Sequence, residues 1–168
     1  MSGKYEFEGR VRYSEIDETG SLSLAGLVNY FQDVSTFQSE ELGVGMDYLK
    51  RQNLAWILSS WQIVIRRMPK LFEQVRSQTW AYGFQGFYGM RNFVLLDGNG
   101  EPAAMANSIW VLYDTKAGRP RKAQSEMMEA YPLGKPLEME YAPRKIALPQ
   151  GGSPREPFVI GKHQLDTN

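Results

Sequence analysis

The chain has 168 residues, 42% of them hydrophobic, enough for one globular domain or one domain and a fragment of another. Its 19 Lys and Arg residues balance 19 Asp and Glu residues, which argues against electrostatic binding to nucleic acid or to a membrane surface. The sequence has no cysteine and a single histidine, His163, so it lacks the ligands of a typical zinc site and the means for a disulfide. No apolar run is long enough to span a membrane, and the N-terminal residues lack the apolar core of a secretory signal. We therefore expect a cytoplasmic domain of mixed helix and strand, without a metal or other cofactor.

The first predicted elements are a strand and a long helix. Alternating apolar residues predict a strand over residues 5–13. After a polar turn, apolar residues at helical spacing predict a helix that either Ser21 or Ser23 caps and that a glycine terminates. Its apolar stripe comprises Leu24, Leu27, Val28, Phe31, Ser35 and Leu42. A short second helix is predicted over residues 46–51.

Runs rich in β-branched and aromatic residues follow, and they predict strands over residues 54–65, 75–82, 90–96 and 104–113. The glycine-rich segments GFQGFYG and DGNGEP join the later runs as hairpins. The first run would extend over about 40 Å, so it has to curve. The simplest packing is an α+β hotdog fold, in which a curved antiparallel sheet wraps the long helix. Its open edges predict a second hotdog, in cis or in a homodimer.

The composition changes toward the C-terminus. Ser125 is expected to cap a brief helix that completes a first domain of residues 1–131. Prolines and a Gly-Gly pair predict that residues 132–156 form an extended linker rather than a packed element. Residues 157–168 are predicted to be the first strand of a truncated second hotdog. That strand would contain Phe158, Val159 and Ile160.

An internal match supports the second hotdog. The segments VRYSEIDETGS (11–21) and VIGKHQLDTN (159–168) both read as a strand that runs into a turn containing an aspartate. Aligning Asp17 with Asp166 places Thr19 opposite Asn168. The segment at 159–168 therefore predicts the start of a repeated unit.

Three stretches carry a family resemblance: NLAWILSSWQIVIRRMPKLFEQVRSQTW, GMRNFVLLD and ANSIWVLYDTKAGRPRK. Over about residues 11–131 they resemble the first half of acyl-acyl-carrier-protein (acyl-ACP) thioesterases, which include plant enzymes and bacterial relatives. The resemblance implies the first half of a double hotdog, and hydrolysis of fatty acyl-ACP to a free fatty acid and ACP. The tail LDTN resembles the opening of the family's catalytic motif, Asp-x-Asn-x-His. By that resemblance Asp166 and Asn168 match the first two catalytic positions, and His163 falls at a non-catalytic one.

A thioesterase of this kind has to enclose a long acyl chain. The space between the helix and the curved sheet is the expected place for an apolar tunnel. The pattern leaves open which strand face points inward, and ordinary core packing is the alternative role for each candidate. Family members often carry an arginine at the position of Ser60. The candidate acyl-binding residues are Val28, Phe31, Trp56, Leu58, Ser60 and Trp61.

The implied partner is acyl carrier protein bearing a fatty acyl-phosphopantetheine. Because this carrier protein is acidic, its docking surface should be basic despite the balanced net charge. The alternative role for each candidate is an ordinary solvated surface. The candidate docking residues are Arg66, Arg67, Lys70, Arg119, Arg121 and Lys122.

Thioester hydrolysis needs an activated nucleophile and donors to the developing oxyanion. The first copy of the repeat carries Thr19 and Ser21 where the family motif has Asn and His. We therefore predict that the first hotdog binds the acyl chain and that the second carries catalysis. Two alternatives stay open: a self-dimerising acyl-CoA thioesterase that uses Asp17, and a non-catalytic acyl-binding module. A lone aspartate in such a turn is more often a turn or capping residue.

Overall fold

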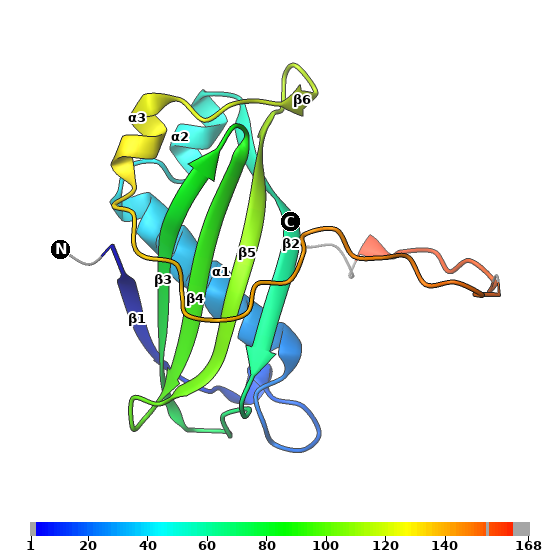
Figure 1. Cartoon of the computed structure of the whole chain (residues 1–168). Coiled ribbons are helices and arrows are strands. Elements are labelled where there is room, and N and C mark those ends of the chain that lie inside the picture. Colours follow the sequence, from blue (N-terminus) through cyan, green and yellow to red (C-terminus); the bar gives the residue numbers. More distant parts are fainter. Residues whose placement is uncertain (1–2, 154, 163–168) are drawn as a thin grey trace.

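An antiparallel sheet curves around the long helix α1 in this computed structural model, which describes residues 3–153 and 155–162 (Figure 1). The strands run in the order β1-β3-β4-β5-β2, and β6 pairs with β5. Their bounds are β1 Tyr5–Arg10, β2 Leu54–Ile65, β3 Gln74–Gln85, β4 Tyr88–Asp97, β5 Pro102–Asp114 and β6 Arg119–Pro120. The helices are α1 Leu24–Glu41, α2 Met46–Arg51 and α3 Ser125–Ala130, with a 3₁₀ turn at Tyr13–Glu15. This is the predicted α+β hotdog architecture.

The helix α1 begins and ends where local chemistry sets its limits. The Ser23 hydroxyl accepts a hydrogen bond from the Gly26 amide at 3.0 Å, so Ser23 rather than Ser21 is the N-cap. After the last helical turn, Gly43 adopts a φ of 74°, the left-handed conformation that glycine tolerates best. None of the helices within the described ranges is long and apolar enough to cross a bilayer.

The buried face of α1 is rotated from the predicted stripe. Leu24 is 56% exposed, whereas Tyr30 and Gln38 turn inward. Both inward polar side chains find partners: the Tyr30 hydroxyl donates to the Arg10 carbonyl at 2.9 Å, and the Gln38 amide oxygen accepts from Arg91 at 2.5 Å. A buried polar group with a hydrogen-bond partner costs far less than an unpaired one, and this pairing allows the rotation.

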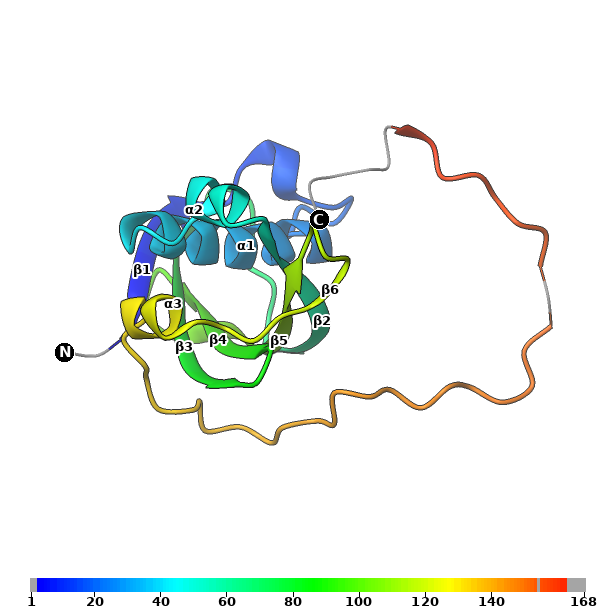
Figure 2. The same cartoon turned by 90° about the horizontal axis from the view of Figure 1, so that it is seen from above.

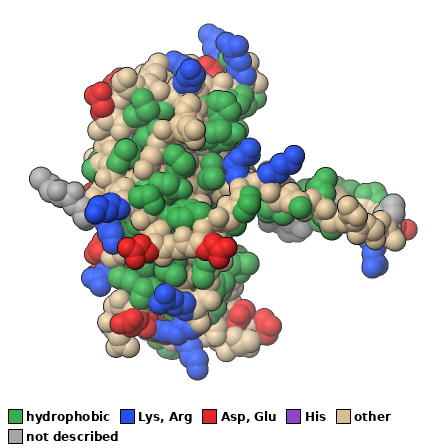
Figure 3. Space-filling model, viewed as in Figure 1, with side chains coloured by type: hydrophobic (Ala, Val, Ile, Leu, Met, Phe, Trp, Pro, Cys, Tyr) green, Lys and Arg blue, Asp and Glu red, His purple; other side chains and the backbone are tan. Residues whose placement is uncertain are grey.

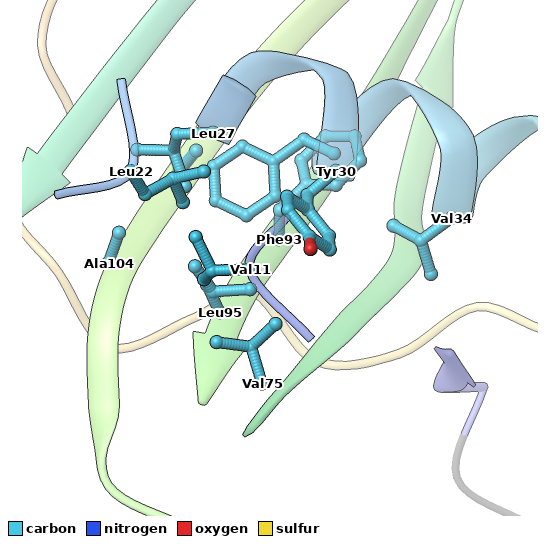
Figure 4. Close-up of a cluster of buried hydrophobic side chains, with 11 residues drawn as sticks. Val11, Leu22, Leu27, Tyr30, Val34, Val75, Phe93, Leu95 and Ala104 are labelled. Atoms are coloured by element: carbon cyan, nitrogen blue, oxygen red, sulfur yellow. The ribbon is translucent and has the colours of Figure 1, made fainter. Parts of the chain in front are cut away.

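The main core lies under the first half of α1 (Figure 4). The Phe31 ring lies 5.9 Å from the Trp61 ring of β2 and 5.1 Å from the Phe93 ring of β4, measured between centroids. Aliphatic side chains complete this cluster, and each fully buried one contributes about 1.5–3 kcal/mol. They include Val11, Leu22, Leu27, Val34, Val75 and Leu95.

A β-bulge in β2 decides which of its side chains face the helix. The pairing of β2 with β5 shifts between Leu58 and Ser60. Leu58 pairs with Trp110, and Trp61 pairs with Ser108. The Trp61 and Trp110 rings pack edge to face, with their centroids 6.4 Å apart. Leu58 and Trp61 therefore share the inner face, while Ser60 takes the outer one.

Several predicted elements differ from the structure, and the strands predicted at 75–82, 90–96 and 104–113 each extend further at both ends. The first strand ends at Arg10, because the chain then leaves the β1–β3 ladder and turns at residues 13–15, where Tyr13 is 81% exposed. The N-cap of α3 is Gln124, one residue before the predicted Ser125. The predicted strand at residues 158–160 is not formed: these side chains are exposed, and no strand of the described chain pairs with them. A strand needs a neighbour to satisfy its backbone.

The first part of the predicted linker packs on the sheet, contrary to expectation. Residues 132–142 cross the convex face on the side opposite α1, from β3 to β2 (Figure 2). The Gly134 amide donates to the Ala81 carbonyl at 2.9 Å, and a Cβ at Gly134 would lie 2.4 Å from the Trp80 ring. The linker thereby covers an outer apolar cluster, which contains Trp80, Val94, Leu96, Met105 and Leu137.

Asn92 of β4 is the central attachment of this linker. Its fully buried side-chain oxygen accepts hydrogen bonds from the Leu137 amide at 3.0 Å and from the Tyr141 hydroxyl at 3.1 Å. At the far edge, the Gln62 side chain donates to the Glu140 carbonyl at 2.7 Å. Sequence composition could not show this, because every one of these contacts joins residues distant in the chain.

Replacing Asn92 with leucine is expected to detach the linker and to lower the free energy of unfolding by about 1–3 kcal/mol, because two donors lose their acceptor. Urea unfolding measures the loss, and hydrogen exchange at the Leu137 amide reports the detachment. Tyr141→Phe removes the hydroxyl that contacts both Asn92 and the Leu137 carbonyl, and it is expected to have a smaller effect because the Leu137 amide keeps its acceptor. Unchanged protection of the Leu137 amide in Asn92→Leu would show that other contacts hold the linker.

Candidate functional site

A cavity of about 770 Å³ opens between the second half of α1, the helix α2 and the inner face of the sheet. This volume falls in the range of about 300–1,000 Å³ found for small-molecule sites. A second buried cluster, which includes Val44, Leu54, Leu112 and Met127, packs beside the cavity. Most exposed residues of the cavity lining lie in two places. Asn29, Asp33, Thr36 and Phe37 lie along α1, and Lys50, Asn53 and Thr115 lie at the end of the sheet where β2 begins and β5 ends, which we call the mouth.

Part of the cavity wall consists of aromatic rings. The Trp56 ring of β2 lies 6.3 Å from the Phe84 ring of β3, which in turn lies 5.8 Å from the Tyr131 ring. Trp110 of β5 closes another side, with its indole N–H donating to the Ser108 hydroxyl at 2.7 Å. Such walls suit an alkyl chain, because they offer apolar contact with few unpaired polar groups.

The cavity lining includes three charged side chains, Asp33, Lys50 and Arg91, of which Arg91 is the buried one. Arg91 of β4 lines the cavity with only 8% of its surface exposed. Its guanidinium donates to the Gln38 amide oxygen at 2.5 Å and to the Thr79 hydroxyl at 3.1 Å. It also lies 5.4 Å from the centre of the Tyr131 ring, a cation–π distance. Burial lowers the pKa of Arg91, because it disfavours the charged form.

Of the six candidate acyl-binding residues, Trp56 lines this cavity. Phe31 and Trp61 lie in the packed core, and Ser60 faces the opposite side of the sheet. Leu58 shares a face with Trp110 but does not line the cavity, and neither does the half-buried Val28. The bulge at residue 59 affects which of these residues face the helix. Counting every second residue from Trp56 would place Trp61 on the outer face, and the extra residue of the bulge moves it to the inner face.

The sequence interpretation missed several lining residues. They are Phe84, Arg91, Trp110 and Tyr131. A signal for Arg91 exists in the strand pattern, because Arg91 alternates with Phe93 and Leu95 on one face. A charged residue in register with buried apolar ones is the kind of exception that marks a site.

The six candidate docking residues form two groups at opposite ends of the sheet. Figure 3 shows Lys and Arg side chains toward both ends of the face that it displays. Arg66, Arg67 and Lys70 follow β2, whose last residue pairs with Ala104 at the start of β5. Arg119, Arg121 and Lys122 follow the other end of β5, near the cavity mouth. A strand of this length spans about 40 Å, so one small partner cannot contact both groups through one patch.

Carboxylates neutralise some of these cations. Arg67 forms ion pairs with Glu73 and, at 2.5 Å, with Asp97. Arg121 lies 3.4 Å from Asp114. The group near the cavity has further basic neighbours in sequence segments that the docking prediction did not include: Lys50, Arg51 and Lys116.

Asp17 holds a turn. One of its carboxylate oxygens accepts from the Thr19 amide at 2.9 Å, the Thr19 hydroxyl at 2.6 Å and the Ser21 amide at 3.3 Å. The hydrogen bond from the Thr19 hydroxyl is the main cause of a lowered pKa at Asp17. Asp166, Asn168 and His163 lie outside the described residues. Within those described, no group of three or more His, Cys, Asp or Glu side chains forms a possible metal site.

Known proteins resemble this chain in sequence and in fold. The family model for the acyl-ACP thioesterase N-terminal domain matches residues 3–131. The chloroplastic acyl-[acyl-carrier-protein] hydrolase FATB1 of Cuphea viscosissima is 26% identical over 173 residues, which span 94% of this chain and 41% of that protein.

Solved structures agree. A protein from Lactobacillus plantarum, solved as an oleoyl thioesterase, has a TM-score of 0.76 and 25% identity over 88% of this chain and 58% of its own. An acyl-ACP thioesterase from Bacteroides thetaiotaomicron has a TM-score of 0.76 and 23% identity over 83% of this chain and 57% of its own. The chain thus spans less than two thirds of these relatives. Because the family model covers most of the sequence, the chain belongs to the acyl-ACP thioesterase family.

Proposed function

We propose that the chain is the acyl-binding half of an enzyme that hydrolyses fatty acyl-ACP to a free fatty acid and ACP. The observation that carries this proposal is the cavity of about 770 Å³ between α1 and the sheet, with aromatic rings in its wall, in a chain that belongs to this family. The acyl chain would lie against Trp56, Phe84 and Trp110, away from water. Such enclosure supplies binding energy far from the reacting bond.

The reaction itself needs an activated water and oxyanion donors, and the described residues that line the cavity include one carboxylate, Asp33, and no histidine. Water has to attack the thioester carbonyl, and the carbon–sulfur bond then breaks, with the pantetheine sulfur leaving as the thiol. The sequence has no cysteine, and its one histidine is His163, outside the described residues. We therefore assign catalysis to the second hotdog, where Asp166 and Asn168 match the family motif.

The route of the linker supports a second hotdog at the free edge of β2. The chain crosses the convex face to β2, where the Gln62 side-chain oxygen accepts from the Ala142 amide at 2.9 Å. Just beyond, Arg144 donates to the Ser59 hydroxyl at 3.2 Å. On this edge Val64 and Ile65 are substantially exposed. A further strand would satisfy the unpaired backbone groups of an edge strand. A second copy in a homodimer is the alternative occupant.

Pairing of two hotdogs through their β2 strands would bring the motif to the cavity. In a two-fold arrangement these strands run antiparallel, so opposite ends of the two units meet. The turn of Asp17 lies at the end where β2 finishes, since Ser21 bridges Lys70 in the loop after β2. The cavity mouth lies at the other end. In the second unit, Asp166 corresponds to Asp17, and it would therefore approach the mouth.

We place ACP docking at the basic group beside the cavity mouth rather than at both ends of the sheet. Lys50 lines the mouth, and Arg119, Arg121 and Lys122 follow β5 at the same end. At the opposite end Arg67 is neutralised by its carboxylate partners. A cytoplasmic location stays a prediction, while the plant relative compared above is chloroplastic.

Asp166→Asn in the protein expressed from its complete gene is expected to reduce acyl-ACP hydrolysis by about 100-fold or more, because a group that activates or positions water is lost. Release of free fatty acid from acyl-ACP measures the rate. Asp17→Asn, the aligned residue of the first hotdog, is the matched control and should retain activity. Loss of hydrolysis in Asp17→Asn with full activity in Asp166→Asn would instead support the single-hotdog enzyme.

Reversing charge at Arg121 and Lys122 together, each to Glu, is expected to raise KM for acyl-ACP by about fivefold and to leave KM for a small acyl thioester unchanged. Added salt should shrink the difference, because it screens surface charges. Arg66→Glu at the opposite end of the sheet is the control. Equal effects of the two changes on acyl-ACP, or no effect of either, would remove the proposed docking site.

The lowered pKa of Asp17 predicts pH-dependent stability. A carboxyl whose pKa falls on folding stabilises the folded state above its unfolded pKa of about 3.9, and the contribution disappears as pH falls through the folded value. Asp17→Asn should therefore unfold at a lower temperature than the wild type at neutral pH, with the gap closing in acid. Thermal unfolding across pH tests this, with Glu18→Gln in the same turn as control. A gap that stays constant with pH would contradict the assignment.

A further inference from the structure

The cavity contains a charge that the binding of an ordinary fatty acyl chain does not explain. Arg91 is buried, and although the Asp33 carboxylate also lines the cavity, no Asp or Glu in the described part of the chain lies within ion-pair distance of Arg91. Its hydrogen-bond acceptors, Gln38 and Thr79, are neutral. Neutral acceptors satisfy individual N–H groups but leave the positive charge without a counter-charge, and burial of such a charge is costly.

The surroundings of Arg91 continue this polarity. The Tyr131 hydroxyl and the Ser39 hydroxyl lie 2.9 Å apart on the same side of the cavity. Thr79 receives one hydrogen bond from Arg91 and donates another to the Asn92 carbonyl at 3.0 Å. The cavity therefore has an aromatic part around Trp56 and Trp110 and a distinct polar part around Arg91.

The Arg91 end of the cavity wall is buried, whereas the lining residues at the end of the sheet are exposed. Lys50, Asn53 and Thr115 are exposed at the mouth, whereas Arg91 and Tyr131 are buried. A thioester held near the mouth would direct the far end of its acyl chain toward Arg91. A methyl group there would displace water from a guanidinium and return no hydrogen bond, which is unfavourable.

We propose that this cavity selects acyl chains that carry an oxygen atom at or near their far end, which accepts hydrogen bonds from the Arg91 guanidinium. The guanidinium has five N–H donors, and the two hydrogen bonds described for it both use the same terminal nitrogen. A hydroxyl, a ketone or a carboxylate shares the required acceptor chemistry. The inference rests on the proposed acyl-binding function and names its substrate class.

The test measures binding, so that it does not depend on catalysis. The probes are amide analogues of acyl-pantetheine, in which nothing can be hydrolysed, made in a series of chain lengths. Each length is prepared with a terminal methyl, hydroxyl or carboxylate group. Binding to the 168-residue chain is followed by calorimetry. The wild type is expected to bind the oxygen-bearing chains about tenfold more tightly than methyl-ended chains of equal length.

Variants identify the group responsible. Arg91→Met should abolish or invert the preference, so that methyl-ended chains bind best. Arg91→Lys keeps a cation in place and should retain a preference for the carboxylate-ended chains. If Arg91→Met does not fold, Arg91→Lys tests whether the charge at this position sets the preference. Arg76→Met, on the β1 side of the sheet and outside the cavity lining, is the matched control and should behave as the wild type.

The outcomes separate this inference from the function on which it rests. Tight binding of methyl-ended chains with no gain from the oxygen, or a preference that survives Arg91→Met, would overturn the role of Arg91 and leave acyl binding intact. Arg91 would then serve only to join α1 to the sheet through Gln38. Failure of every probe to bind would overturn the acyl cavity and this inference together.

Discussion

The packing of α1 against the concave face of the sheet governs the rest of the molecule. Phe31, Trp61 and Phe93 fill the space under the first half of the helix, with centroid distances of 4.9–5.9 Å. Toward the other end of α1, a second buried cluster that includes Val44, Leu112 and Tyr131 packs beside the cavity. The same concave face of the sheet therefore carries both the packed core and the cavity.

The convex face meets a different constraint. An apolar sheet surface needs cover, and here the segment after α3 supplies it through Trp80, Leu137 and the buried Asn92. The same segment ends at β2, the edge where a further strand has room to pair. One stretch of chain thus seals the outer face and determines where a following domain would begin. The need to cover this apolar face explains why the proline-rich segment makes specific contacts over residues 132–142.

Charge is distributed unevenly despite the balanced total. At one end of the sheet Arg67 forms ion pairs with both Glu73 and Asp97, while at the end near the cavity Arg121 pairs with Asp114 alone. Inside the cavity Arg91 has none. A surface cation contributes little by itself because water screens it, whereas a buried cation strongly affects what can bind beside it. Arg91 is therefore the group from which the chemistry of the bound chain is best inferred.

The sequence alone determined the features that depend on local chemistry. The helix that ends at a glycine, the strand runs and the hairpins followed from residue spacing and propensity, since those signals act over a few residues. The family followed from the resemblance of three sequence stretches to known thioesterases. The tertiary structure decided the rest. The bulge in β2 set the faces of Trp56 and Trp61, and Gln38 and Arg91 turned inward because each supplied the other's hydrogen-bond partner. The linker packs on the sheet because the Asn92 side chain accepts hydrogen bonds from Leu137 and Tyr141. Each of these outcomes depends on a partner far away in the chain, and a local pattern cannot contain that information.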